Sequence, residues 1–221
     1  MISPLRGWAS RWLKGSVDRW SSGKAVRFLV AGLGNPGARY ARSPHNLGFM
    51  VVDRLAEREG IRLARRQGQA VVGSGEVGGQ PVLLAKPQTY MNLSGKAVEA
   101  LLAKHSLGPG SLVVVYDDHD LPFQALRIRT QGSAGGHHGM ESIIQCLGTG
   151  DFVRVRVGIN PGAGKAEADF LLHPLGREQS AELDELLDYA AQAVAAIISE
   201  GAEKAMTKFN RRAQGEPFEE K

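Results

Sequence analysis

Short apolar runs alternate with amphipathic helical patterns along the chain from Lys24 onward. Apolar and β-branched runs predict strands, and apolar residues spaced three and four apart predict helices. We expect strands over Ala25–Leu33, Ala70–Val77, Pro81–Lys86, Leu112–Tyr116, Ala125–Thr130 and Phe152–Ile159, and helices over Leu47–Arg58, from Ser94, over Met140–Leu147 and over Ser180–Ser199. No linker or repeat divides these elements. The alternation therefore predicts a single α/β domain, with helices flanking a mostly buried, mixed sheet.

A glycine-rich loop, VAGLGNPG in residues 30–37, follows the first predicted strand. Its glycines have the G-x-G-x-x-G spacing of dinucleotide-binding loops, which also need a helix opening at the loop and an acidic residue after the next strand. Here Pro44 interrupts any helix that begins at the loop. The nearby acids, Asp53 and Glu57, lie inside the helix predicted after His45. This context argues against NAD binding.

The net charge of the chain is concentrated at one end. Residues 1–24 hold five lysines and arginines and one aspartate, and so account for the whole net charge of +4. All three tryptophans also lie there. We expect a separate basic, Trp-rich extension that packs on the domain, is poorly ordered, or serves as a targeting peptide or as a contact with RNA or a membrane surface. In the remaining domain, affinity for nucleic acid must come from local clustering of charge.

Cysteine and serine patterns narrow the chemistry. The single cysteine, Cys146, excludes an internal disulfide framework, which fits a reducing, cytosol-like compartment. Cys146 also lies within the apolar helical pattern SIIQCL, which favours a core position over a nucleophile. The serines lack a G-x-S-x-G elbow, and no run is apolar enough to span a bilayer. We therefore expect neither a covalent nucleophile nor a membrane partner.

Polar side chains gather after four of the predicted strands, where ligands of α/β sheets usually bind. His45 directly precedes a helix, whose partial positive charge favours a neutral imidazole. An aspartate at the end of a neighbouring strand could orient that ring as a general base. The alternative is a histidine that caps or fills a loop.

A metal site is a further alternative for the same loops. The candidate ligands are Asp117, Asp118, His119, Asp120, His137 and His138. Adjacent residues rarely point to one ion, and no H-x-x-x-H or H-E-x-x-H spacing occurs. The pattern therefore does not favour metal catalysis.

Two predicted strands carry alternating arginines. Arg127 and Arg129 alternate with apolar residues on one strand, and Arg154 and Arg156 do so on another. A period of two places each pair on one face of its strand, opposite the apolar residues. These faces are either ordinary solvated surfaces or, with the basic segment Lys204–Arg212, a phosphate-binding surface.

Four motifs, in order along the chain, resemble those of the bacterial-type peptidyl-tRNA hydrolase family. They are GLGNPGARYARSPHNLGF, KPQTYMNLSGKAV, YDDHDLPF and GSAGGHHGM, and the resemblance runs from about Val26 to Arg212. It implies a monomeric, single-domain α/β fold with a twisted mixed sheet, over residues 25–212, followed by a polar tail in residues 213–221. It also implies hydrolysis of the ester that joins a peptide to the 3′-terminal ribose of tRNA, without a cofactor or metal. The implied partner is peptidyl-tRNA, bound by its acceptor stem and 3′ end in the cytoplasm, although residues 1–24 leave an organellar address open.

The resemblance assigns roles to individual residues. His45 matches the family's catalytic base, and Asp117 matches the carboxylate that supports it. Asn35 matches the position that distinguishes N-blocked from free aminoacyl-tRNA, and the loop glycines would turn the backbone tightly so that Asn35 faces a peptide. Positions that bind the substrate or face the tRNA match Tyr40, Tyr90, Met91, Asn92, Arg129, His138 and Arg156. Asn92 is also a candidate for positioning water or the developing oxyanion.

The chain departs from the family pattern at three positions. Pro44 stands where the family usually has arginine, His119 where its acidic loop often has leucine, and His138 where it has a tRNA-binding asparagine. These departures bear on substrate affinity more than on the reaction. They keep two alternatives open: a non-catalytic RNA-binding relative, as in the plastid splicing-factor branch of the family, and a metal-dependent hydrolase.

Overall fold

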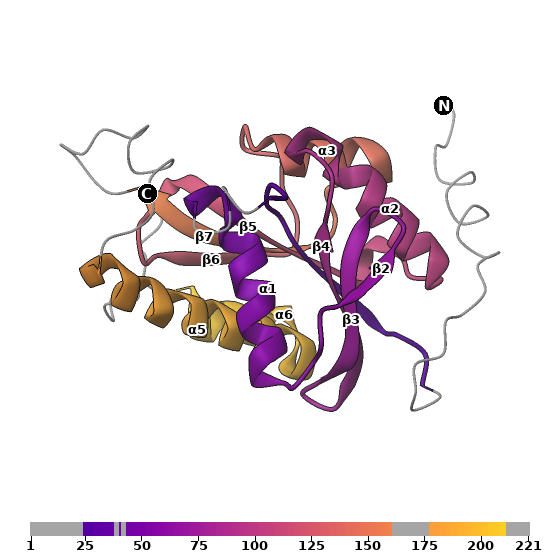
Figure 1. Ribbon diagram of the computed structural model, residues 1–221, viewed down its shortest axis with the longest axis horizontal. Helices are drawn as coiled ribbons and strands as arrows, with labels where there is room; N and C mark the ends of the chain where they lie inside the picture. The colour runs from indigo at the N-terminus through magenta and orange to yellow at the C-terminus, as the bar shows by residue number, and fades with distance from the viewer. Residues whose placement is uncertain (1–23, 38–39, 41–42, 161–176, 211–221) are drawn as a thin grey trace.

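The computed structural model describes residues 24–37, 40, 43–160 and 177–210 (Figure 1). Within them lies a seven-stranded sheet of order β2-β3-β4-β1-β5-β7-β6. The strands are β1 (Phe28–Gly32), β2 (Arg65–Gln67), β3 (Ala70–Val77), β4 (Gln80–Pro87), β5 (Leu112–Pro122), β6 (Leu126–Arg129) and β7 (Val153–Asn160). The helices are α1 (Leu47–Arg58), α2 (Ser94–Lys104), α3 (His138–Leu147), α5 (Arg177–Glu200) and α6 (Ala202–Phe209), with 3₁₀ turns η3 (Pro44–Asn46), η4 (Met91–Leu93) and η5 (Pro109–Ser111).

The sheet is mixed, as the alternation of elements predicts. Strand β1 lies parallel to β4 and β5, and β5 lies parallel to β7. Strands β2, β3 and β4 form an antiparallel meander, and β6 closes the other edge antiparallel to β7. The prediction of a single α/β domain is therefore confirmed, and parallel β1 and β5 at its centre direct the loops after them to one edge.

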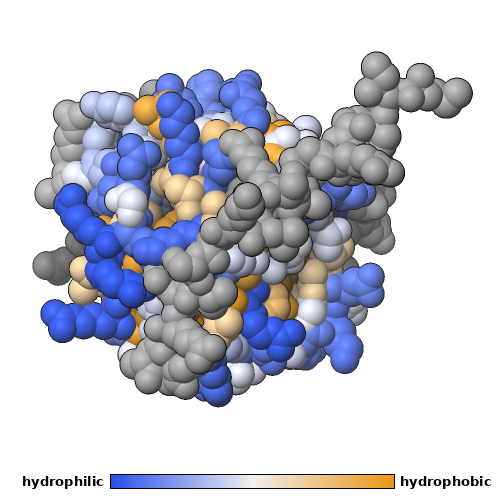
Figure 2. Space-filling model, turned by 90° about the vertical axis from the view of Figure 1, so that its right-hand side faces the viewer, coloured by the Kyte–Doolittle hydropathy of each residue, from blue (hydrophilic) through white to orange (hydrophobic). Residues whose placement is uncertain are grey.

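Helices cover both faces of the sheet. Helices α1, α5 and α6 pack on one face and α2 and α3 on the other (Figure 1), and each face buries its own apolar cluster. On the face seen in Figure 2, hydrophilic side chains lie around the rim, and apolar residues show only in small areas between them. Among the described residues, no helix is long and apolar enough to cross a membrane.

Two glycines let α1 meet the sheet backbone to backbone. A Cβ atom on Gly48 of α1 would lie 2.4 Å from the carbonyl oxygen of Val115, and one on Gly32 of β1 would lie 2.1 Å from the carbonyl oxygen of Gly48. Of the glycines in the loop at residues 30–37, only Gly37 has a positive φ. For the other glycines, the expectation of a tight turn that makes Asn35 face a peptide stays a prediction. Gly32 permits a close approach between β1 and the start of α1.

The strand boundaries differ from the sequence prediction in one place that affects the site. The strand expected over Leu112–Tyr116 continues as β5 to Pro122, so Asp117–Asp120 lie on a strand and not in a loop after it. Strand β5 keeps its pairing with β7 through Asp118 and shifts register between Asp118 and Pro122.

Parts of the predicted organisation lie outside the described residues. These are the basic extension except Lys24, the polar tail at 213–221, and Arg211 and Arg212. Lys24 itself pairs with Glu76 of β3, at 2.7 Å between Nζ and Oε1.

Candidate active site

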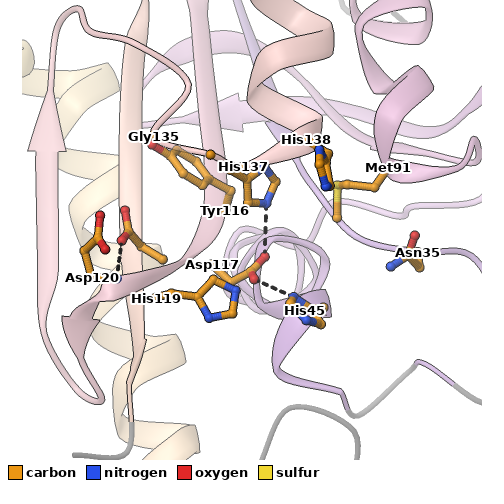
Figure 3. Close-up of a pocket in the computed structure, with 12 residues that line it drawn as sticks. Asn35, His45, Met91, Tyr116, Asp117, His119, Asp120, Gly135, His137 and His138 are labelled. Carbon is orange, nitrogen blue, oxygen red and sulfur yellow. Dashed lines mark hydrogen bonds and ion pairs between the residues drawn. The ribbon is translucent and has the colours of Figure 1, made fainter. Parts of the chain in front are cut away.

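A cavity of about 440 Å³ opens at the edge of the sheet where β1 and β5 end. Its lining combines the glycine-loop residue Asn35, His45 of η3, Met91 of η4, the end of β5, and residues 135–138 at the start of α3. The four polar segments singled out in the sequence therefore converge, as expected from their positions after neighbouring strands. Figure 3 shows how these side chains face one another.

His45 and Asp117 form a hydrogen-bonded pair in this cavity. The Nδ1 atom of His45 lies 2.8 Å from Oδ2 of Asp117, which is fully buried, whereas the histidine side chain is 34% exposed. An ionised carboxylate can only accept, so His45 Nδ1 carries the hydrogen and donates it. The neutral ring then has its lone pair on Nε2. This is the arrangement of an oriented general base.

The pair shifts the titration of both groups. Burial alone would raise the pKa of Asp117, but hydrogen bonds from His137 and His45 outweigh it and hold that pKa well below its usual range. The hydrogen bond to Asp117 raises the pKa of His45 above 6.5, against an opposing effect of burial. We expected the partial positive charge at the start of α1 to favour the neutral form of His45. The hydrogen bond to the buried carboxylate of Asp117 acts in the opposite direction and has the larger effect on the pKa of His45.

A second histidine, His137, holds the other oxygen of the same carboxylate. Its Nδ1 accepts hydrogen bonds from the backbone N–H groups of Gly139 and Met140, at 3.1 and 3.2 Å, and so caps α3. The hydrogen of the neutral ring is therefore on Nε2, which lies 3.4 Å from Oδ1 of Asp117 (Figure 3). The ring of Tyr116 packs against His137, with 4.9 Å between centroids.

From the sequence, His137 was expected only as a possible metal ligand, and its role as a second donor to Asp117 was not predicted. Helix N-caps are usually Ser, Thr, Asp or Asn, so a histidine before α3 does not stand out as a cap. The one sequence feature that pointed to a capping role was the position of His137 shortly before a predicted helix, in the loop that follows the strand with Arg127 and Arg129.

Asn46 joins the glycine loop to the turn that carries His45. Its Oδ1 accepts from the backbone N–H of Asn35 at 2.7 Å, and its Nδ2 donates to the backbone oxygen of Asn35 at 3.0 Å. Asn46 stands at the start of α1 as predicted, but its side chain makes no capping bond to the helix. These paired bonds fix Asn35 relative to His45.

The other predicted substrate-binding residues fall into two groups. Met91 and His138 line the cavity with Asn35 and His45. The remaining positions, Tyr40, Tyr90, Asn92, Arg129 and Arg156, are not part of its lining. Tyr90 is 76% exposed beside Met91, and His138 is exposed with its Nδ1 3.7 Å from Oε2 of Glu141.

The arginines of β6 and β7 lie on one face of the sheet but differ in their surroundings. The register pairs Arg127 with Arg156 and Arg129 with Arg154, so all four share that face. Arg156 bonds to Asp118 and lies 3.8 Å from Asp120. Arg156 thus lies beside the cavity, whose wall includes Asp118. Because Arg154 is buried, the other three arginines remain candidates for contact with phosphate.

Arg154 is a correction to the expectation of two solvated pairs. It is buried, and it donates to the backbone oxygens of Ser133 and Gly150 at 2.7 and 2.6 Å. Its guanidinium also lies 4.7 Å from the ring centroid of Phe152. Arg154 therefore supports the loop before His137 from beneath.

Within the described residues, one group of three has the spacing of metal ligands. His45, Asp117 and His119 each offer an atom that lies within 4.8 Å of the others. Asp118, Asp120, His137 and His138, which the sequence also suggested, are not part of it.

Comparisons with known proteins agree with the motifs. Residues 29–217 match the family model described as peptidyl-tRNA hydrolase. The peptidyl-tRNA hydrolase of Solibacter usitatus is 57% identical over 85% of this chain and 96% of its own, and that of Koribacter versatilis is 48% identical over 83% and 92%. The crystal structure of peptidyl-tRNA hydrolase from Acinetobacter baumannii superposes with a TM-score of 0.75 at 30% identity, covering 85% of this chain and 97% of that one.

Proposed function

The chain belongs to the peptidyl-tRNA hydrolase family, and we propose that it hydrolyses peptidyl-tRNA with His45 as the general base. The observation that carries this assignment is the 2.8 Å contact between His45 and the buried, ionised Asp117 in an open cavity. The same contact argues against the non-catalytic RNA-binding alternative, because RNA binding alone does not need an oriented imidazole.

The reaction follows from this geometry. Nε2 of His45 takes a proton from water as the water oxygen attacks the ester carbonyl, and Asp117 stabilises the imidazolium that forms. The tetrahedral intermediate then breaks its bond to the ribose oxygen, which takes the proton from His45. The products are a peptide acid and a tRNA with a free 3′ hydroxyl. General-base assistance of this kind is typically worth ~10²–10⁴-fold in rate.

His137 acts in this scheme as a positioning residue. His137 donates to Oδ1 of Asp117 and so holds the carboxylate in place. The hydrogen bonds by which His137 caps α3 hold its own ring in place. Asp117 thereby presents Oδ2 to His45 without a rotation of the carboxylate. Both oxygens of a fully buried carboxylate are then satisfied, which removes the penalty of leaving one unpaired.

We propose that the peptide and the 3′ end of the tRNA occupy the cavity, with Asn35 facing the peptide. Tyr40, Tyr90, Met91, Asn92 and His138 would contact this end of the substrate from the wall and the surroundings of the cavity. The acceptor stem would run along the arginine face of β6 and β7, which carries Arg129 and Arg156. One copy of the chain supplies every group in this assignment, so we expect a monomer to be active.

The decisive test is release of N-acetyl-amino acid from N-acetyl-aminoacyl-tRNA in the presence of EDTA. We expect the parent protein to hydrolyse this substrate and His45→Ala to lose roughly 10²–10⁴-fold in kcat. Circular dichroism of both proteins controls for folding. Full turnover by a folded His45→Ala protein would contradict the role of His45.

A further inference from the structure

His119 faces the general base but has no part in the proposed hydrolysis. It follows Asp117 by two residues on β5, so both side chains project from the same side of that strand. Its ring centroid lies 5.4 Å from that of His45, with the ring planes inclined by 58°. His119 is exposed at the mouth of the cavity, and with His45 and Asp117 it forms the three-residue group whose ligand atoms lie within 4.8 Å of one another. Two imidazole rings thus lie next to each other, with the carboxylate of Asp117 hydrogen-bonded behind His45.

A pair of imidazoles suits a transition-metal ion. Zinc binds imidazole nitrogen and carboxylate oxygen at about 2.0–2.2 Å, which places tetrahedral ligand atoms roughly 3.3–3.6 Å apart. The ligand atoms of the group lie within 4.8 Å of one another, so the two imidazole nitrogens must come closer together to hold one ion. Imidazole favours Zn²⁺, Co²⁺ and Ni²⁺, whereas Mg²⁺ prefers oxygen ligands and retains its water.

His45 is already oriented as such a ligand. A histidine that binds a metal usually donates its other ring N–H to a carboxylate, which fixes the tautomer and the ring. The bond from Nδ1 of His45 to Asp117 at 2.8 Å is that interaction, and His137 in turn holds the far oxygen of Asp117. The lone pair for the metal would be the one on Nε2.

We propose that His45 and His119, supported by Asp117, bind a divalent transition-metal ion, and that the bound ion inhibits hydrolysis. The ion occupies the lone pair with which His45 would take a proton from water, so the metal-bound protein has no general base. Inhibition rests on the proposed function, whereas binding of the ion does not. Removal of metal by a chelator therefore raises activity.

Binding is tested directly on the full chain, freed of metal with EDTA and then desalted. Titration calorimetry with ZnCl₂, and the visible absorption of added Co²⁺, report the site without any substrate. We expect His119→Leu and His45→Ala to weaken Zn²⁺ binding by at least about tenfold. His138→Leu is the matched control, because it removes another exposed histidine of the same cavity that is not part of the group. Equal Zn²⁺ affinity in the parent and His119→Leu proteins would overturn the proposal, and MgCl₂ should give no comparable signal.

Inhibition is tested with N-acetyl-aminoacyl-tRNA, each variant being compared with its own rate in EDTA. We expect Zn²⁺ to inhibit the parent and His138→Leu proteins alike, and half-inhibition of His119→Leu to need at least about ten times more Zn²⁺. Equal inhibition of all three proteins, or acceleration by Zn²⁺, would refute an inhibitory site at His119. A parent protein inactive even in EDTA would instead refute the proposed function, and calorimetry would still decide whether the metal binds.

Discussion

The two oxygens of Asp117 are bound by two different histidines, and the variant His137→Ser separates their roles. Serine is a good helix N-cap, so it retains the start of α3, but it is too short to reach Asp117. We expect kcat/KM to fall about tenfold, in keeping with the loss of one hydrogen bond to a charged group. The acid limb of the pH profile should move to higher pH, since a carboxylate relieved of one donor holds the proton of His45 more strongly.

Steady-state kinetics of His137→Ser from about pH 5 to 9, in EDTA, check this expectation against the neighbouring variant His138→Ser. The groups that face His45 from β5, Asp117 and His119, remain the same in both proteins. A purely structural role for His137 would lower the amount of active protein without moving the acid limb.

The pH dependence of the parent follows from the direction of the His45 shift. The base must be neutral to act, and its hydrogen bond to Asp117 raises its pKa above 6.5. The value of kcat/KM should therefore rise with pH and reach half its plateau above pH 6.5. In Asp117→Asn the charge that favours imidazolium is gone, so the midpoint should move to lower pH while the plateau falls. A midpoint that stays in place in Asp117→Asn would show that another group controls the profile.

At the scale of elements, the contact between α1 and the sheet sets the position of His45. Gly48→Ala would place a Cβ 2.4 Å from the backbone of Leu33 and Val115, although alanine is the better helix former. We expect a loss of about 1–3 kcal/mol in the free energy of unfolding, together with a marked loss of kcat. Urea denaturation and the hydrolysis assay measure the two effects. Gly110→Ala is the control, because a Cβ there meets nothing within 4 Å, and a similar response of both variants would contradict the contact.

The sequence predicted the elements better than their ends and their neighbours. Periodicity identified α1, β3, β4 and β7, because burial on one face or both leaves a local pattern. It ended β5 at Tyr116, because the polar residues Asp117–Asp120 break the apolar run, although pairing with β7 continues to Asp118. Periodicity also predicted a solvent-exposed Arg154, whereas its side chain is buried. Its backbone acceptors, on Ser133 and Gly150, lie outside the strand, so the residue pattern of the strand does not reveal them.

The site was predictable to the same degree. His45, Asp117, Asn35, Met91 and His138 were named from their positions after strands or from the family motifs, and the structure brings them to one cavity. Two interactions were not predicted: the hydrogen bond from His137 to Asp117, and the pair of hydrogen bonds between Asn46 and the backbone of Asn35. Both depend on which side chain meets which across the fold, and only the folded chain determines that.

At the scale of the whole molecule, the chain divides its charge unevenly, and removal of residues 1–23 tests the consequence. Lys24 is kept because it pairs with Glu76. The family match begins at residue 29, so we expect the truncated protein to fold and to hydrolyse a minimal acceptor-stem substrate at the parent rate. If the segment contacts full-length tRNA, the log–log salt dependence of binding should become shallower by up to ~0.7–0.9 per lost phosphate contact. A truncated protein that fails to fold would show that the tryptophans belong to the core.

The two hydrogen bonds between Asn46 and the backbone of Asn35 link substrate recognition to catalysis. The side chain of Asn46 holds the backbone of Asn35, which is proposed to recognise the peptide. The residue directly before Asn46 is His45, which is proposed to activate water. A lineage that altered Asn46 would change what it accepts and how fast it reacts in the same step. Substrate preference can therefore change independently of the reaction rate only by substitution of the Asn35 side chain. Asn46 itself stays constrained, because its replacement would also displace the general base.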